Sequence, residues 1–390
     1  MPIKASAFAV AVAVSACLAP AAHAAGWKRV TTPDGASSDQ VALLRTGDGV
    51  LHVAWHHPTG PNAEDLLHTA IARNGRIGAT TPIQTGWTGF ENAALTAGPL
   101  GLRVFFGAIR STDTNDPNRE LNTALSADGG ATWALQEGSV VADGAQAYGS
   151  PVAATTLSGG DTLQAWAGTL GTWVHSGLSP ATPNHDYQAP VGQYGYDTGL
   201  ATDALDRTVM AWYSNASGRL GVLAQGVAAD GSPIGSAATM PGTGTMQVGT
   251  LSRTPVIARR GGGVYVGYAT GYPSATRVRL WRVGASSAPS VTRVSGNGNQ
   301  PVAVAAAEDG RLWVAWVNNA GGVPQVYARR SNEGATRFGA TVRGGRVKGS
   351  GAAYTLDASA AGGALDVLAN FNIGTTATTA THHRRLLPGL

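Results

Sequence analysis

Three acidic residues and one arginine stand directly before short apolar segments and could take part in catalysis. They are Asp39, Glu91, Asp197 and Arg253. Hydrolysis of a glycosidic bond requires two carboxyl groups that flank the bond, at a separation set by the mechanism. These four residues are therefore the catalytic candidates, and the distance between the carboxyl groups decides between hydrolysis and binding alone.

A second group of candidates combines polar side chains with aromatic rings. Rings stack on the apolar faces of sugars, while amides and carboxylates form hydrogen bonds with the hydroxyl groups. The sequence thus predicts a ligand site for a glycan. The predicted ligand-binding residues are Asn92, Tyr148, Tyr196, Thr254, Gln300, His56, Arg110, Tyr213 and Tyr272.

Other chemistries lack their characteristic motifs. The sequence contains no H-E-x-x-H, G-x-S-x-G or G-x-x-x-x-G-K pattern. The adjacent pair His56 and His57 would point to opposite faces of a strand and could not chelate one ion together. Asp113 and Asp116 lie in a loop without the Gly and Glu of a helix-loop-helix calcium site, so a solvated loop is the simpler interpretation. We therefore expect no metal and no cofactor.

The elements that would position these residues recur along the chain. An apolar strand that ends in an aromatic residue returns about every 52 residues, and a period near 50 with Gly-rich turns is typical of four-stranded β-propeller blades. The strong copies lie at 51–55, 163–166, 209–212 and 312–316, and weaker copies end at Phe106, Tyr268 and Asn370.

Two further strands recur in the same register. Small residues predominate in the earlier one, as expected for inner strands that crowd around a central channel; its copies lie at 40–43, 92–95, 150–153, 198–201, 254–257, 300–303 and 351–354. Third strands are predicted at 66–72, 120–126, 172–178, 219–226, 277–283, 325–330 and 376–382. The sequence predicts an all-β fold, a single propeller of seven four-stranded blades, with six blades as the alternative. The segment 27–31 has no blade of its own and is predicted to close the ring as the outer strand of blade seven.

The octapeptide at 126–133 reads S-x-D-x-G-x-T-W. It resembles the Asp-box, a hairpin motif of sialidases and of several unrelated secreted propellers. An acidic side chain followed by glycines accepts hydrogen bonds from a tight turn, and the Trp packs the hairpin onto its sheet. The resemblance implies a structural role for Ser126, Asp128, Gly130, Thr132 and Trp133. A degenerate copy at 331–338 falls at the same turn in blade six.

A sialidase would need more than this motif. The resemblance would imply an arginine triad, an acidic Asp, and a Tyr activated by a Glu, whereas the Arg-Ile-Pro signature of the family is absent. Arg45, Arg110 and Arg253 do not form a convincing triad, because Arg45 falls toward the far end of its strand. We therefore expect recognition of an extracellular glycan or other polymer without catalysis. A glycoside hydrolase with diverged motifs and a protein-binding scaffold are the alternatives.

The N-terminal 25 residues have the pattern of a secretory signal. Lys4 precedes an apolar stretch, and Ala22-His23-Ala24 forms a cleavage site, so the predicted mature propeller domain spans 26–390 and works outside the cytoplasm. Cys17, the only cysteine, lies in this signal; a lipid anchor at Cys17 is the alternative. No later segment is apolar enough to span a membrane, and the net charge of +4 without a basic run predicts no nucleic-acid partner.

Overall fold

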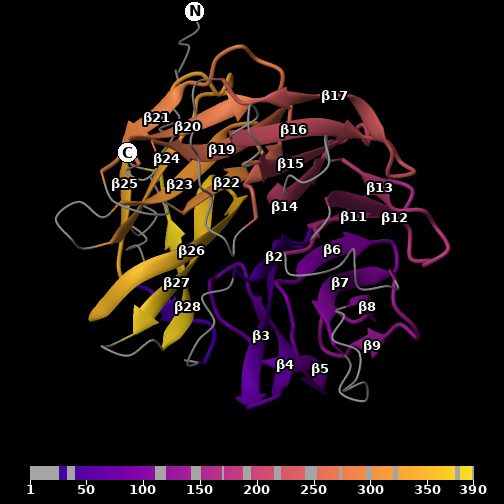
Figure 1. Cartoon of the computed structure of the whole chain (residues 1–390). Helices are drawn as coiled ribbons and strands as arrows, with labels where there is room; N and C mark the ends of the chain where they lie inside the picture. The colour runs from indigo at the N-terminus through magenta and orange to yellow at the C-terminus, as the bar shows by residue number, and fades with distance from the viewer. Residues whose placement is uncertain are drawn as a thin grey trace, which may run out of the picture.

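The strands of this chain form seven antiparallel sheets of four strands each. The computed structural model describes residues 26–32, 40–109, 120–141, 151–168, 171–187, 195–214, 221–241, 253–271, 275–295, 301–318, 324–373 and 378–388, with Gly195 and Tyr196 described only in their backbone. Within these ranges every regular element is a strand. Figure 1 shows the sheets around a common centre, with β2, β6, β14, β22 and β26 nearest to it. The predicted seven-bladed propeller is confirmed.

Each blade begins at the channel and ends at the periphery. From inner to outer strand, the blades are β2 (Ala42–Arg45), β3 (Leu51–Gly60), β4 (Ala63–Ile71) and β5 (Thr81–Trp87); β6 (Ala94–Gly98), β7 (Gly101–Ala108), β8 (Glu120–Ser126) and β9 (Ala134–Leu135); β10 (Ala153–Thr156), β11 (Thr162–Ala167), β12 (Thr172–Ser176) and β13 (His185–Asp186); β14 (Gly195–Thr202), β15 (Thr208–Ser214), β16 (Gly221–Val227) and β17 (Pro233–Thr239); β18 (Val256–Ala258), β19 (Val264–Thr270), β20 (Arg277–Arg282) and β21 (Ser290–Arg293); β22 (Val302–Ala306), β23 (Leu312–Asn318), β24 (Gln325–Arg330) and β25 (Val342–Gly345); and β26 (Ser350–Ala361), β27 (Ala364–Ile373), β28 (Thr379–Leu386) and β1 (Lys28–Arg29).

Most inner strands start about two residues later than predicted. The polar residues before them form hydrogen bonds with the neighbouring blade instead of joining their own ladder. The Val152 N–H donates to the Asn92 carbonyl at 3.0 Å, and the Thr254 N–H donates to the Asp197 carbonyl at 2.7 Å. These residues therefore link neighbouring blades by backbone hydrogen bonds beside the channel.

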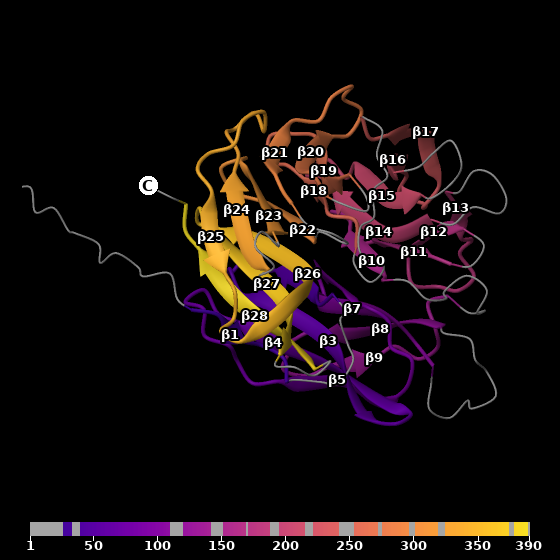
Figure 2. The same ribbon diagram turned by 60° about the vertical axis from the view of Figure 1, so that its left-hand side comes forward.

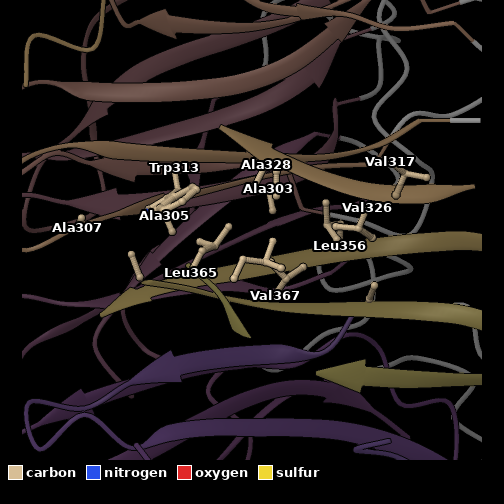
Figure 3. Packing of buried hydrophobic residues seen from close by; sticks show 14 of the residues in the cluster. Ala303, Ala305, Ala307, Trp313, Val317, Val326, Ala328, Leu356, Leu365 and Val367 are labelled. Atoms are coloured by element: carbon tan, nitrogen blue, oxygen red, sulfur yellow. The ribbon is translucent and has the colours of Figure 1, made fainter. Parts of the chain in front are cut away.

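The core lies between adjacent blades. Figure 3 shows Trp313 of blade six beside Leu365 and Val367 of blade seven, all three fully buried. Small residues are required where inner strands approach one another: a Cβ atom added to Gly199 of β14 would lie 2.9 Å from Val256 Cγ1 of β18. Burial on both faces explains why the second strands are almost continuously apolar.

The N-terminal segment closes the ring, as predicted. Lys28 and Arg29 pair with His383 and His382 of β28, and Figure 2 shows β1 beside β28 at the edge of blade seven. Trp27 Nε1 also donates to the Gly344 carbonyl at 3.0 Å. Blade seven thus contains both ends of the described chain.

Candidate functional site

The predicted site residues that the structure describes lie on the face where loops lead into the inner strands, here called the channel mouth. Asp39, Arg110, Tyr148, Tyr272 and Gln300 lie outside the described residues. Tyr196 is placed by its backbone, paired with Tyr213 across β14 and β15.

Arg253 crosses the channel. Its Nε donates to the Val152 carbonyl at 2.8 Å, its Nη1 to the Val41 carbonyl at 3.3 Å, and its Nη2 to the Ala93 carbonyl. These carbonyls directly precede β10, β2 and β6, so one side chain from blade five links blades one, two and three. The guanidinium is thus held by backbone oxygens, and burial lowers the pKa of Arg253.

A carboxyl group that the sequence did not reveal lies in the same channel. Asp357 accepts a hydrogen bond from Gln40 Nε2, and Gln40 Oε1 in turn accepts the Arg253 N–H at 2.5 Å. Burial raises the pKa of Asp357 to about 7, against the opposing effects of the Arg253 charge and the Gln40 hydrogen bond. The inner strands of all seven blades line a channel cavity of about 220 Å³ around this network. A lone acid within a strand of small residues was the available sequence signal.

Asp197 and Thr254 form the contact between blades four and five. Asp197 has a φ of 55° within a bulge of β14, an unusual conformation for a residue other than glycine. Its side chain is buried, and burial raises the pKa of its carboxyl group well above the usual range. Thr254 is buried as well, and its N–H donates to the Asp197 carbonyl.

Glu91 and Asn92 occupy the equivalent step into blade two. Asn92 is buried, and its carbonyl accepts the Val152 N–H, whereas Glu91 is half-buried and its N–H donates to the Gly107 carbonyl at 2.9 Å. Glu91 is therefore accessible to a ligand at the mouth, whereas the buried Asn92 is not.

His56 on β3 lies next to Glu64 on β4, a residue that the sequence analysis missed. His56 Nδ1 and Glu64 Oε2 are 3.3 Å apart, with the side chains 10% and 24% exposed. The same Glu64 oxygen accepts the Phe90 N–H at 3.2 Å, which brings this carboxylate next to the segment that carries Glu91. The Phe90 ring packs against Trp87 and Phe106. His56, Glu64 and Glu91 thus gather on the blade-one and blade-two side of the channel mouth.

The Asp-box-like turn has the geometry that its residues imply. Asp128 Oδ1 accepts the Thr132 N–H at 2.9 Å and the Ser126 hydroxyl at 2.8 Å, and these bonds with the Thr132 hydroxyl lower the pKa of Asp128 to about 2. The Trp133 ring packs against the His68 ring of blade one, with the ring centroids 5.3 Å apart, and a Cβ atom at Gly130 would overlap the His68 ring. In the degenerate copy the acceptor is Asn332, which binds the Thr336 N–H at 2.9 Å.

The arginines do not form a triad among the described residues. Arg45 ends β2 at the face opposite the channel mouth, where it binds Asp366 at 2.6 Å, while Arg253 lies near the mouth. Within the described ranges, no group of three or more His, Cys, Asp or Glu residues could hold a metal ion. No helix there is long and apolar enough to cross a membrane.

Comparison with protein-family models and with curated proteins gives no match. Solved structures share the fold. A polysaccharide lyase described as a PL25 ulvan lyase is 11% identical, with a TM-score of 0.56 over 93% of this chain and 94% of that one. The same lyase bound to -[GlcA(1-4)Rha3S]- is 10% identical, with a TM-score of 0.55 over 93% of this chain and 94% of that one. The polysaccharide lyase Uly1 is 10% identical, with a TM-score of 0.55 over 89% of this chain and 90% of that one.

Proposed function

We propose that this chain is a secreted propeller that binds an extracellular glycan at the channel mouth. The observation that carries this proposal is the pair formed by His56 and Glu64, which lies beside the segment of Glu91 and keeps part of its side-chain surface exposed at the mouth. An imidazole and two carboxylates suit the hydroxyl groups of a sugar, whereas the Trp87 and Phe90 rings are buried and support this wall from behind. Segment 1–25 is proposed as the secretory signal, with a lipid anchor at Cys17 as the alternative.

The rest of the mouth supports a site on one side rather than along the channel axis. Arg253 crosses the channel, and Asn92, Asp197 and Thr254 join neighbouring blades. Ligand contacts are therefore proposed for the blade-one and blade-two side. We propose an acidic polysaccharide as the ligand class, because a similar structure is that of a lyase bound to a repeat with a uronic acid and a sulfated sugar.

Binding of defined polysaccharides, measured by titration calorimetry, tests this proposal. Substitution His56→Ala or Glu64→Gln is expected to weaken binding about tenfold, the loss of one charge-assisted hydrogen bond. His57→Ala is the matched control, because adjacent residues of β3 point to opposite faces of the sheet. Absence of binding to acidic and neutral polysaccharides alike would reject the glycan ligand and favour a protein partner.

Catalysis at the same place is the second candidate. An imidazole next to a carboxylate is an arrangement that general bases use. A lyase reaction would remove the proton beside a uronate carboxylate and break the bond to the leaving glycosidic oxygen, which takes up a proton. Such a reaction yields an unsaturated sugar detected by ultraviolet absorbance, and His56→Ala should abolish it. Release of reducing ends without that absorbance, abolished by Glu91→Gln, would instead support a hydrolase, and a fluorogenic sialoside tests the sialidase alternative.

A further inference from the structure

The face opposite the channel mouth contains a groove with three arginines. A cavity of about 700 Å³ on this face is lined by Arg45 from β2, Arg73 after β4 and Arg385 from β28. Glu308 of blade six lines the same cavity. This volume falls within the range of small-molecule sites. We call this cavity the arginine groove.

Two of the three guanidinium groups, those of Arg45 and Arg385, are held in place by a buried carboxylate behind them. Asp366 is 4% exposed and lies 2.6 Å from Arg45 Nη2 and 3.4 Å from Arg385 Nη1. Arg385 Nη1 also donates to the Arg73 carbonyl at 3.1 Å, and Arg45 Nη1 donates to the Gly49 carbonyl at 2.8 Å. Such prior ordering lowers the entropic cost of binding a ligand.

Positive charge remains available in the arginine groove. Asp366 can neutralise only one of its two arginine partners. The Arg73 side chain is exposed, lies over Gly49, and forms no hydrogen bond within the described ranges. Guanidinium groups bind pairs of oxygens of carboxylates and of tetrahedral oxyanions through two parallel hydrogen bonds. The groove therefore suits a ligand with one anionic group near Arg73 and Arg385.

The acidic side chain in the groove favours a sugar acid over a bare anion. Glu308 would repel an inorganic anion, but its carboxylate accepts hydrogen bonds from hydroxyl groups. The arginine groove borders the channel cavity, since Leu43, Ile257 and Ala358 line both. We propose that the arginine groove is a second binding site, separate from the channel mouth, for a monosaccharide-sized sugar that carries a single carboxylate or sulfate ester.

The test is calorimetric titration of the protein with glucuronate, glucose 6-sulfate, glucose and inorganic sulfate. Glucuronate or the sugar sulfate should bind, more weakly as salt concentration rises, while glucose should not. Arg73→Gln should weaken binding about tenfold. Arg76→Gln, an exposed arginine three residues away that does not line the groove, should leave binding unchanged.

Glu308→Ala separates a sugar site from a simple anion site. It should weaken the binding of a sugar acid, which loses the carboxylate that accepts from its hydroxyl groups, whereas it would strengthen the binding of a bare anion by removing a repulsive charge. The proposal would be overturned if inorganic sulfate or glucose bound as tightly as the sugar acids do, or if Arg73→Gln had no effect on their binding. His56→Ala should leave this binding intact, so failure at the channel mouth and failure in the arginine groove are distinguishable.

Discussion

Two buried histidines meet where blade one contacts the Asp-box-like turn. His68 Nε2 lies 3.1 Å from His52 Nδ1, and the rings stack with centroids 5.3 Å apart. Burial, together with a smaller effect of the nearby His52, lowers the pKa of His68 to about 4, and burial also lowers the pKa of His52. A protonated pair would place two positive charges side by side in the core, so both imidazoles remain neutral.

This pair makes stability dependent on pH. The unfolded chain takes up protons on His68 below about pH 6.5, whereas the folded protein resists until about pH 4. The free energy of unfolding should therefore decrease as the pH is lowered from about 6.5 to about 4, by about 2–3 kcal/mol from His68 alone. His68→Gln should make this dependence on pH less steep, as measured by urea titrations at several pH values. Asp357→Asn should steepen it, because the raised pKa of Asp357 stabilises the folded state as the pH falls below about 7. Parallel slopes for His68→Gln and the parent protein would contradict this interpretation.

Asp366 of β27 connects the last blade to the first. Its carboxylate lies 2.6 Å from Arg45 of β2 and 2.9 Å from His383 of β28. Asp366→Asn should reduce the free energy of unfolding by about 3 kcal/mol, since it leaves the Arg45 side chain, only 13% exposed, without its carboxylate partner. Asp309→Asn is the control: Asp309 binds Arg330 at 2.6 Å but is 44% exposed, so its loss should cost less than about 1 kcal/mol. Equal losses in denaturant titrations would show that burial of the pair is immaterial.

The elements differ in how much of their placement the sequence carries. Strands such as β8 and β24 begin and end where their apolar pattern predicts, because inter-blade packing imposes that pattern. The outer strands β9 and β13 have two residues each and no apolar pattern to detect.

The positions of the candidate residues were predictable, but their contacts were not. The repeat register correctly brought Glu91, Asp197 and Arg253 to one end of the propeller strands. The use of Arg253 by carbonyls of three other blades, and the approach of Glu64 to His56, depend on neighbours that no local pattern encodes.

At the scale of the whole molecule, a closed ring depends on a very short segment. β1 pairs through only two residues, yet contacts on either side reinforce it. The Val30 N–H donates to the Thr381 carbonyl at 2.9 Å, the Thr31 hydroxyl accepts the Thr381 N–H at 2.9 Å, and the Trp27 ring lies edge-on to Phe371 at 5.1 Å. Without this segment, the outer edge of β28 would expose unpaired backbone groups, a known template for association between chains.

Removal of residues 26–32 should therefore both destabilise and oligomerise the protein. We expect a loss of about 3 kcal/mol or more, from the buried part of Trp27 and Val30 and the lost backbone hydrogen bonds. The truncated protein should show a lower Tm and a concentration-dependent shift in light scattering after size-exclusion chromatography. The control is the double substitution Lys28→Ala and Arg29→Ala, which removes exposed side chains but retains the backbone pairing, and it should stay monomeric with a nearly unchanged Tm. A monomeric truncated protein with the parent Tm would contradict this prediction. It would mean that the blade-seven sheet is stable with three strands and that the N-terminal strand contributes little to the stability of the ring.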